Sequence, residues 1–294
     1  MTLQKKILRS LKKNLSFYLT GSILTALCIM LWVGAFSVSR TVIGTYTRLF
    51  EQNDLEDGQF TVSSPISDED INALESEFSV TLERQSFQNI SYGGTVIRLF
   101  ADTQKIDKAV ILEGSQLRDD DEVLLTYNYA KEQGLSIGDT ITLAGHDYVI
   151  CGLCIRPDYA AMYANPEDSF PNSTDFGIAL ITPNAMNSIG GYSSYYSVKY
   201  IIPEREADFR AAIYSRYGTL EYIGKSANPR TGGLLSQADD LESEFSVYSP
   251  IIMIVVVAVI AMVLGRTVRR ESRTIGTLMA LGYRRSELMR QYLW

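Results

Sequence analysis

The stretch Asn14–Ser39, NLSFYLTGSILTALCIMLWVGAFSVS, is 26 residues without a charge, and Phe245–Gly265, FSVYSPIIMIVVVAVIAMVLG, is a second uncharged run of 21. At a helical rise of ~1.5 Å per residue the two runs reach roughly 39 Å and 31 Å, against a bilayer hydrocarbon core of ~30 Å. Each run is therefore long enough to span a membrane as a helix. The sequence predicts a membrane protein with transmembrane helices at 14–39 and 245–265.

The charges divide between the ends and the middle of the chain. Residues 1–13 and 266–294 together hold twelve Lys and Arg against two Asp and Glu, a balance of +10. Residues 40–244 hold 15 Lys and Arg against 32 Asp and Glu, or −17, and the two sums give the net charge of −7. Cytoplasmic segments beside membrane spans are enriched in Lys and Arg. This pattern predicts that 1–13 and 266–294 are cytoplasmic and that a large extracytoplasmic domain lies between the spans.

The first run also has the features of a secretory signal peptide, since a basic segment precedes it and small residues lie at 34–37. Its apolar core is longer than the ~7–15 residues usual for such a peptide, which favours a retained span. Within it, Gly21, Thr25 and Cys28 fall on one helical face, as a small-residue packing seam would. Scattered small residues without a partner are the alternative.

The residues between the spans are expected to form an α+β domain at 59–223, either as one body or as two lobes. Strand-like alternation occurs at Thr95–Phe100, Val123–Leu125, Thr140–Leu143, Tyr148–Ile155, Gly177–Ile181 and Ser197–Ile202. Helical spacing occurs at 67–78, where Ser67 caps through Asp70 and Ile71, Leu74 and Phe78 share a face, and at 204–217, with Phe209 and Ile213. Turns are expected at Gly93-Gly94, Gly138-Asp139 and Gly145, and the strands are expected to form antiparallel hairpins.

The helical period continues beyond both spans. In the segment 40–58, Val42, Tyr46 and Leu49 prolong the apolar face of the first span. In the segment 224–244, a linker is followed by Leu234, Ala238, Leu241, Phe245 and Tyr248 at helical spacing. We expect these two stripes to pair as a helical stalk. The alternative is that each stripe packs against the domain.

The segment after the second span has the most specific pattern. In RRESRTIGTLMALG, residues 269–282, a basic helix is expected to leave the membrane and to stop at Gly282. Its four arginines Arg266, Arg269, Arg270 and Arg273 share one face, which favours contact with anionic membrane lipid. Ile275, Leu278 and Leu281 form an apolar edge, and Gly276 permits close backbone approach.

This segment resembles the cytoplasmic coupling segment of the MacB/FtsX-like family of ABC transporter permeases. The residues that match the family pattern are Arg273, Ile275, Gly276, Ala280, Leu281 and Gly282, whereas Thr274 stands where the family often has Glu. Residues 124–152, LLTYNYAKEQGLSIGDTITLAGHDYVICG, are similar to a strand, helix and hairpin of the family's MacB-like periplasmic core domain. The order of basic N-terminus, span, external domain, span and coupling segment is also the family's.

The resemblance implies a permease subunit that performs no chemistry and has no cofactor. A separate cytoplasmic ATPase would contact the coupling segment through Glu271, Arg273, Ile275, Gly276, Leu278, Ala280, Leu281, Gly282 and Arg284. The ATPase would drive export, the handling of lipoproteins or peptides, or the regulation of cell-envelope enzymes, from the bacterial plasma membrane. A second permease copy or duplicated half and an envelope protein are the other implied partners. Family permeases have four or more spans, so we expect a further span to begin near Trp294.

Other functions have weaker support in the sequence. The closest approach to a Walker loop, Gly218–Ser226, has wrong spacing and a strand-like interior, and His146 is the only histidine. The uncharged spans disfavour a secondary transporter, and the basic clusters beside them are typical of lipid contact and not of nucleic-acid binding. A two-span sensor with an external ligand-binding domain is the main alternative, although no sustained heptad follows the second span.

Three local features of the external domain have two interpretations each. Cys151 and Cys154 are buried thiols if they lie on one strand, or a disulfide if the chain turns at Gly152. The acidic run 119–122 is a solvated loop or a calcium site. The tyrosines in 192–196 form a ligand or partner surface, or pack as strand residues.

Overall fold

The computed structural model describes residues 15–165, 168, 170–270, 272–282 and 286. The chain divides into two compact units. Residues 1–41 and 239–294 form a helical unit, and Val42–Ala238 form a second unit, which we call the α+β unit. The chain is thus a mixed α+β fold with a large sheet and an apolar helix near each end.

The described part of the helical unit contains α2 (Leu15–Gln52) as far as Thr41, α7 (Gly232–Arg270) from Asp239 onward, and α8 (Ser272–Ala280). By length and composition, Thr25–Gln52 in α2 and Ser243–Met262 in α7 could each cross a membrane. Large apolar side chains along them are exposed, with Met30 at 72% and Leu31 at 68%. A patch of this kind is rare on soluble proteins and is typical of a surface covered by lipid or another helix.

Within the helical unit, α2 and α7 line a common apolar cavity of about 510 Å³. Thr25, Cys28 and Trp32 of α2 face it together with Phe245 and Met253 of α7. Two of the three residues of the expected small-residue seam therefore face α7.

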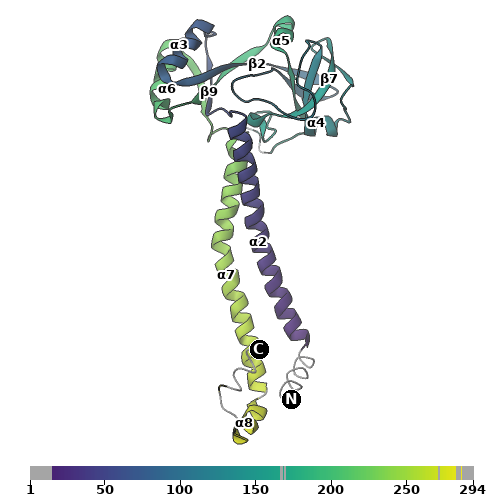
Figure 1. The fold of residues 1–294 in the computed structure, drawn as a ribbon, viewed down its shortest axis with the longest axis vertical. Helices are drawn as coiled ribbons and strands as arrows, with labels where there is room; N and C mark the ends of the chain where they lie inside the picture. Colours follow the sequence, from purple (N-terminus) through teal and green to yellow (C-terminus); the bar gives the residue numbers. More distant parts are fainter. Residues whose placement is uncertain (1–14, 166–167, 169, 271, 283–285, 287–294) are drawn as a thin grey trace. The chain divides into compact units, whose positions relative to one another are not determined.

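The α+β unit contains one ten-stranded sheet in the order β10-β1-β9-β2-β3-β8-β5-β7-β4, with β6 paired to β7 (Figure 1). The strands are β1 (Gly58–Val62), β2 (Val80–Tyr92), β3 (Thr95–Ala101), β4 (Val110–Gly114), β5 (Glu122–Thr126), β6 (Thr140–Leu143), β7 (His146–Ile155), β8 (Phe176–Ile181), β9 (Ser193–Tyr200) and β10 (Thr219–Gly224). The helices are α3 (Asp68–Phe78), α4 (Tyr127–Glu132), α5 (Pro183–Ile189) and α6 (Glu206–Tyr217), with short 3₁₀ turns at Pro157–Tyr159 and Pro203–Arg205.

The sheet is mixed: it contains the expected antiparallel hairpins and also parallel pairs. The hairpins β2–β3 and β6–β7 form as expected, and the turn glycines Gly93, Gly94 and Gly145 all have positive φ. However, β3 pairs with β8, and β5 with β7, in parallel. A parallel neighbour requires a crossover, and α4 lies within the crossover from β5 to β7.

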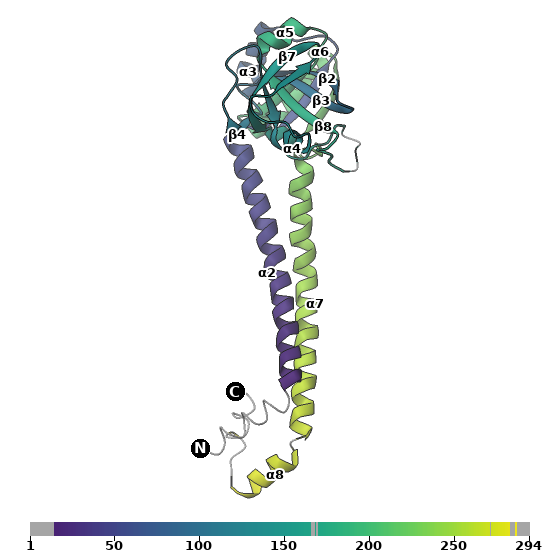
Figure 2. The same ribbon diagram turned by 90° about the vertical axis from the view of Figure 1, so that its right-hand side faces the viewer.

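Two lobes share this sheet, one with α3 and α6 and the other with α4 and α5 (Figure 1). In Figure 2, which is turned by 90°, the two lobes overlap. The first lobe buries Phe60, Leu74, Phe78, Phe209 and Ile213 in one cluster. The expected helix start is confirmed, since the side chain of Ser67 accepts a hydrogen bond from the Asp70 amide.

The second lobe has its own core, in which Leu99, Val123 and Tyr129 are fully buried. Tyr129 packs directly over Gly177 of β8, where a Cβ atom would overlap the phenol ring. The Tyr129 hydroxyl and Thr95 Oγ1 are 2.6 Å apart. Glycine at 177 therefore lets α4 lie close to the sheet.

Candidate functional site

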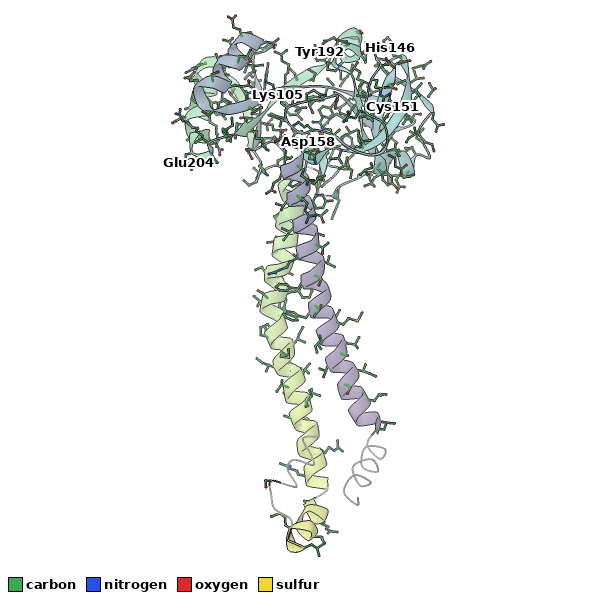
Figure 3. All side chains as sticks on the ribbon, in the orientation of Figure 1. Lys105, His146, Cys151, Asp158, Tyr192 and Glu204 are labelled. Atoms are coloured by element: carbon green, nitrogen blue, oxygen red, sulfur yellow. The ribbon has the colours of Figure 1, made fainter. Side chains whose placement is uncertain are left out.

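A cluster of buried polar side chains lies where the chain leaves α2 and where it enters α7. We call it the polar joint, and it consists of Glu56, Asp107, Arg156, Asp158, Ser197, Asn228 and Arg230, all of them buried. They come from five places in the chain: the segment after α2, the β3–β4 loop, the segment just after β7, strand β9 and the β10–α7 loop. Figure 3 shows Asp158 between the two lobes, with Cys151 on one side and Glu204 on the other.

A single hydroxyl lies between two carboxyl groups at the centre of the joint. Ser197 Oγ is 2.6 Å from Glu56 Oε2 and 3.1 Å from Asp107 Oδ2. The Glu56 amide donates to Asp107 Oδ1 at 2.9 Å. A serine hydroxyl has one hydrogen to donate, so it can donate to only one of the two carboxyl oxygens. The second contact is a hydrogen bond only if that carboxyl group is protonated.

The charges of the joint favour such a proton. Glu56, Asp107 and Asp158 face Arg156 and Arg230, which leaves one negative charge in excess when every group is ionised. Burial, together with the charge of Asp158, raises the pKa of Glu56 to about 7. Burial and the charge of Glu56 raise the pKa of Asp107 well above its ordinary value. One bound proton brings the joint to neutrality.

The joint connects the two chain segments that adjoin the helices. Asn228 Nδ2, in the loop before α7, donates to Glu56 Oε1 at 3.3 Å, just after α2. Arg230 donates from its backbone and from Nε to Asn228 Oδ1, and its Nη2 donates to Gln59 Oε1 at 2.7 Å. The Arg230 guanidinium also stacks over the Tyr159 ring at 4.3 Å. Both segments are therefore held in the same buried cluster of the α+β unit.

The other arginine of the joint is completely buried. Arg156 donates to both carboxylate oxygens of Asp158, at 2.7 and 2.9 Å, and its Nη2 donates to Gln85 Oε1 at 3.1 Å. Its guanidinium lies 4.0 Å from the centre of the Phe100 ring. Its Nη1, however, is buried without a hydrogen-bond partner among the described residues, as are Gln85 Nε2 and the Tyr195 hydroxyl.

Backbone and ion-pair contacts fix the end of α2 further. The amides of Asp107 and Lys108 donate to the carbonyls of Asp54 and Asn53, each at 3.1 Å. Asp54 also accepts from Lys108 Nζ at 2.8 Å, and this bond is the main reason that its pKa is lowered. The Asp57 amide donates to the Val198 carbonyl of β9 at 2.8 Å. The end of α2 is therefore bonded to the β3–β4 loop and to the sheet.

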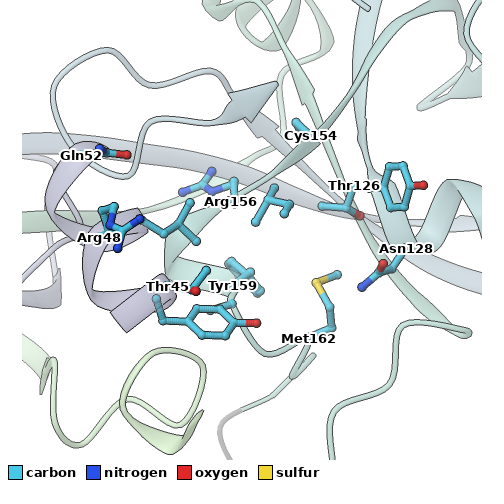
Figure 4. A pocket seen from close by; sticks show the side chains of 14 residues that line it. Thr45, Arg48, Gln52, Thr126, Asn128, Cys154, Arg156, Tyr159 and Met162 are labelled. Carbon is cyan, nitrogen blue, oxygen red and sulfur yellow. The ribbon is translucent and has the colours of Figure 1, made fainter. Parts of the chain in front are cut away.

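Beside the joint is a cavity of about 400 Å³ within the α+β unit (Figure 4). Its walls come from the last two turns of α2, from residues 126–128 where β5 meets α4, and from residues 154–162 at the end of β7 and after it. Arg48 and Arg156 are the charged side chains that line it. Its volume is within the ~300–1,000 Å³ range of small-molecule sites.

The expected ATPase-coupling residues lie together on one short helix and its end. Arg273, Ile275, Gly276, Leu278 and Ala280 are in α8, followed by Leu281 and Gly282. Gly282 has a φ of +94°, and its amide donates to the Met279 carbonyl at 3.1 Å, so the expected glycine stop is present. Glu271 and Arg284 lie outside the described residues. Leu281 is 72% exposed, an apolar side chain without cover.

Some of the residues that were expected to pair in a stalk are described next to residues outside the expected partner stripe. Tyr46 and Leu49 line the 400 Å³ cavity of the α+β unit, and Val42 is half-buried. This arrangement favours the alternative in which the first stripe packs against the domain. Phe245 lines the cavity within the helical unit, while the side chains of Ala238 and Leu241 lie outside the description. Pairing of the two stripes stays a prediction.

Strand geometry bears on the cysteine and tyrosine alternatives, and among the tyrosines in 192–196 only Tyr192 is exposed. Cys151 and Cys154 lie within β7, both buried and free, and burial raises the pKa of Cys151 to about 11 and that of Cys154 to about 12. Neither thiol is therefore a ready nucleophile. His146 is exposed at the start of β7, and the described residues contain no group of three metal-ligand side chains. Tyr195 and Tyr196 pack as buried strand residues.

Sequence reasoning did not find the polar joint, since its members are scattered from residue 56 to residue 230. The local signal was the segment 224–233, which we expected to be a linker, and within it Asn228, Arg230 and Thr231 are buried. Comparison with known proteins adds no assignment for the joint or for α8, because no family model and no curated protein matches this chain.

Proposed function

We propose that this chain is the transmembrane permease subunit of an ABC transporter of the mechanotransmission type. In this proposal α2 and α7 cross the bacterial plasma membrane, the N-terminus and α8 are cytoplasmic, and the α+β unit is extracytoplasmic. The chain itself performs no catalysis, and a separate ATPase hydrolyses the nucleotide.

The observation that carries the proposal is the polar joint. Glu56 follows α2 within four residues, and Asn228 precedes α7 by four residues, yet their side chains are bonded to one another inside the α+β unit. Buried hydrogen bonds and ion pairs of the joint therefore resist a displacement of either helix end. The same contacts connect the residues of the two lobes. Such a joint suits a domain that is moved through its two helices.

The geometry of α8 gives a second line of support. The helix is short, it ends at a left-handed glycine, and Gly276, Ala280 and Leu281 are exposed. An exposed glycine and small residues on a helix permit close approach by a partner protein. The apolar Leu281 side chain would then be covered by that partner.

Charge supports the orientation. The basic segments 1–13 and 266–294 fit the cytoplasmic side and contact with anionic lipid, and the acidic α+β unit fits the outside. A second permease copy or duplicated half would complete the membrane part, and an envelope protein or an exported peptide or lipoprotein would act on the α+β unit.

Labelling of intact cells tests the orientation: an impermeant reagent should modify a cysteine placed at Tyr192 and spare one placed at Thr277.

Co-purification tests the partner. The full chain, expressed in its own host and extracted in mild detergent, should carry a stoichiometric ATPase. Gly276→Asp and Leu278→Asp should each remove it, because a charge would lie in the contact. Ser272→Asp is the matched control, since it adds the same charge at the exposed start of α8. Retention of the ATPase by both variants would contradict the proposal.

A two-span membrane sensor is the second candidate, and the cavity of about 400 Å³ is the observation that favours it. A sensor would bind a ligand there and pass the signal to a cytoplasmic output. Purification of the chain with a kinase or adaptor in place of an ATPase would support this candidate.

A further inference from the structure

The two contacts of the Ser197 hydroxyl differ in length, and the difference locates the proton of the polar joint. Ser197 Oγ is 2.6 Å from Glu56 Oε2 and 3.1 Å from Asp107 Oδ2. A hydroxyl that donates to an ionised carboxylate lies ~2.5–2.7 Å from it, so Ser197 donates to Glu56. The serine hydrogen is then used, and Asp107 supplies the hydrogen of the longer contact. The proton therefore lies on Asp107 Oδ2.

The charges inside the joint agree with this assignment. Three buried carboxyl groups face two buried guanidinium groups, so one negative charge is in excess until a proton is bound. Burial and the charge of Glu56 raise the pKa of Asp107 well above its ordinary value. The hydrogen bond from Ser197 favours the ionised form of Glu56. Asp107 is thus the carboxyl group that keeps its proton longest as the pH rises.

Charged groups at the margin of the joint do not take the place of this proton. Five of them form ion pairs with one another and are 32–42% exposed, so water screens them: Asp54, Asp57, Lys108, Lys199 and Lys225. Glu83 accepts from the amides of residues 104–106 in the β3–β4 loop. Asp102, at the start of that loop, is a further carboxyl group, and burial raises its pKa. Neither group compensates a negative charge on Asp107.

The protonated carboxyl group lies where two segments of the chain meet. The Glu56 amide donates to Asp107 Oδ1 at 2.9 Å. The amides of Asp107 and Lys108 donate to the carbonyls of Asp54 and Asn53, each at 3.1 Å. These bonds hold the segment 53–57, just after α2, against the β3–β4 loop. If Asp107 loses its proton, Ser197 can donate to only one of two carboxylates, and an uncompensated charge is left between the segments.

We propose that Asp107, Ser197 and Glu56 form a proton latch. With the proton bound, segment 53–57 is held against the β3–β4 loop, and when the proton leaves, the two segments separate. As a regulator of the coupling between α2 and the α+β unit, the latch rests on the permease proposal. The pH outside the membrane then sets how firmly the α+β unit follows its helix.

The direction of the pH dependence follows from where the proton is bound more tightly. In the open latch Asp107 faces water and has an ordinary pKa of about 3.9. In the closed latch its pKa is raised. Closure is therefore complete below about pH 4 and is lost as the pH rises through the raised pKa. Within that interval each pH unit makes opening up to about ten-fold more frequent.

Hydrogen exchange of the full chain in nanodiscs tests the latch. The amides of residues 53–57 and 106–108 are followed by mass spectrometry in the wild type and in Asp107→Asn, and the comparison at each pH cancels the chemical exchange rate. Asparagine keeps an acceptor for the Glu56 amide and a donor for Ser197, and it tolerates the φ of +57° at this position. The ratio of wild-type to variant exchange should rise at least about ten-fold from pH 5.5 to pH 8.5.

Asp54→Asn is the matched control. It removes the same charge two residues before Glu56, at a φ of +53°, but the hydrogen bond from Lys108 lowers the pKa of Asp54, which is ionised throughout this range. Its exchange ratio to the wild type should not change with pH. Far-UV circular dichroism confirms that each variant is folded.

A second comparison needs no variant. In the wild type at pH 8.5, the amides of residues 53–57 and 106–108 should exchange through an opening at least about ten-fold more frequent than that of the β6–β7 hairpin, because a latch opens without unfolding the sheet. Equal openings, or an Asp107→Asn ratio that does not depend on pH, would overturn the inference. An ATPase that fails to co-purify would leave the exchange unchanged, so the two proposals fail separately.

Discussion

Replacement of Glu56 by glutamine removes the excess negative charge of the polar joint while it keeps the shape of the side chain. The introduced carboxamide can still accept from Asn228 and contact Ser197, which Glu56 does now at 3.3 and 2.6 Å. Asp107 and Asp158 would then face Arg156 and Arg230 with equal charge. The Glu56→Gln variant should therefore lose the proton binding that belongs to Glu56, while burial still raises the pKa of Asp107.

The size of the effect follows from the pKa of Glu56, which burial and Asp158 raise from 4.5 to about 7. A shift of roughly 2.5 units corresponds to about 3 kcal/mol at ~1.4 kcal/mol per unit. Because the folded state holds this proton more tightly than the unfolded state, its stabilisation is complete below about pH 4.5 and is lost as the pH rises through about 7. The glutamine variant escapes that loss. Its advantage over the wild type should grow from about 1 kcal/mol near pH 5.5 to roughly 3 kcal/mol at pH 8.

The buried thiols provide the assay. In a Cys28→Ser background, Cys151 and Cys154 react with a pyridyl disulfide only when the α+β unit opens, and the comparison of both proteins at each pH cancels the reactivity of the thiol itself. At pH 8 the glutamine variant should be labelled up to roughly 300-fold more slowly, the equivalent of about 3 kcal/mol. A glutamine variant that is labelled faster than the wild type at pH 8, or a ratio that does not change between pH 5.5 and 8, would refute the shared proton.

Three further predictions concern the packing of the α+β unit. Gly177→Ala should lower the melting temperature followed by circular dichroism, at a cost of about 1–3 kcal/mol, because its methyl group overlaps the Tyr129 ring; an unchanged melting temperature would contradict this. Phe209→Ala should cost about 3–5 kcal/mol, since the ring is fully buried against Phe60 and Phe78, and hydrogen exchange of the α6 amides should rise accordingly. Cys154 should stay unmodified by maleimide at pH 8 in the native chain and react fully in denaturant, because it is buried and its pKa is raised to about 12.

The sequence predicted correctly those elements whose pattern extends over only a few neighbouring residues. The cap at Ser67 and the helical face of Leu74 were readable because capping and helical period act over a few residues. Strand β6 was expected with its observed bounds, since its alternation and its turn at Gly145 lie together. Strand β9 was expected at 197–202 but spans Ser193–Tyr200, because its start is set by pairing with β2 and not by its own pattern.

Features that depend on distant residues were not readable. Strand β2, 13 residues long, mixes polar and apolar positions because it crosses both lobes and changes its neighbours along its length. The polar joint depends on residues that are even further apart. Glu56 and Asn228 are hydrogen-bonded although 172 positions separate them in the sequence, and no periodic pattern relates them. Buried charges of this kind look like ordinary surface residues in a sequence. The site expected at 271–284 rests on resemblance, and both the site and its partner stay predictions.

The permease proposal depends most directly on what α8 contacts in the cell. A photo-reactive amino acid placed at Thr277, which is exposed on α8, would capture the neighbouring protein in living cells. We expect one adduct, with an ATPase whose peptides include a Walker loop, and we expect Leu278→Asp to abolish it. Adducts with lipid alone, or with a kinase or adaptor, would contradict the proposal.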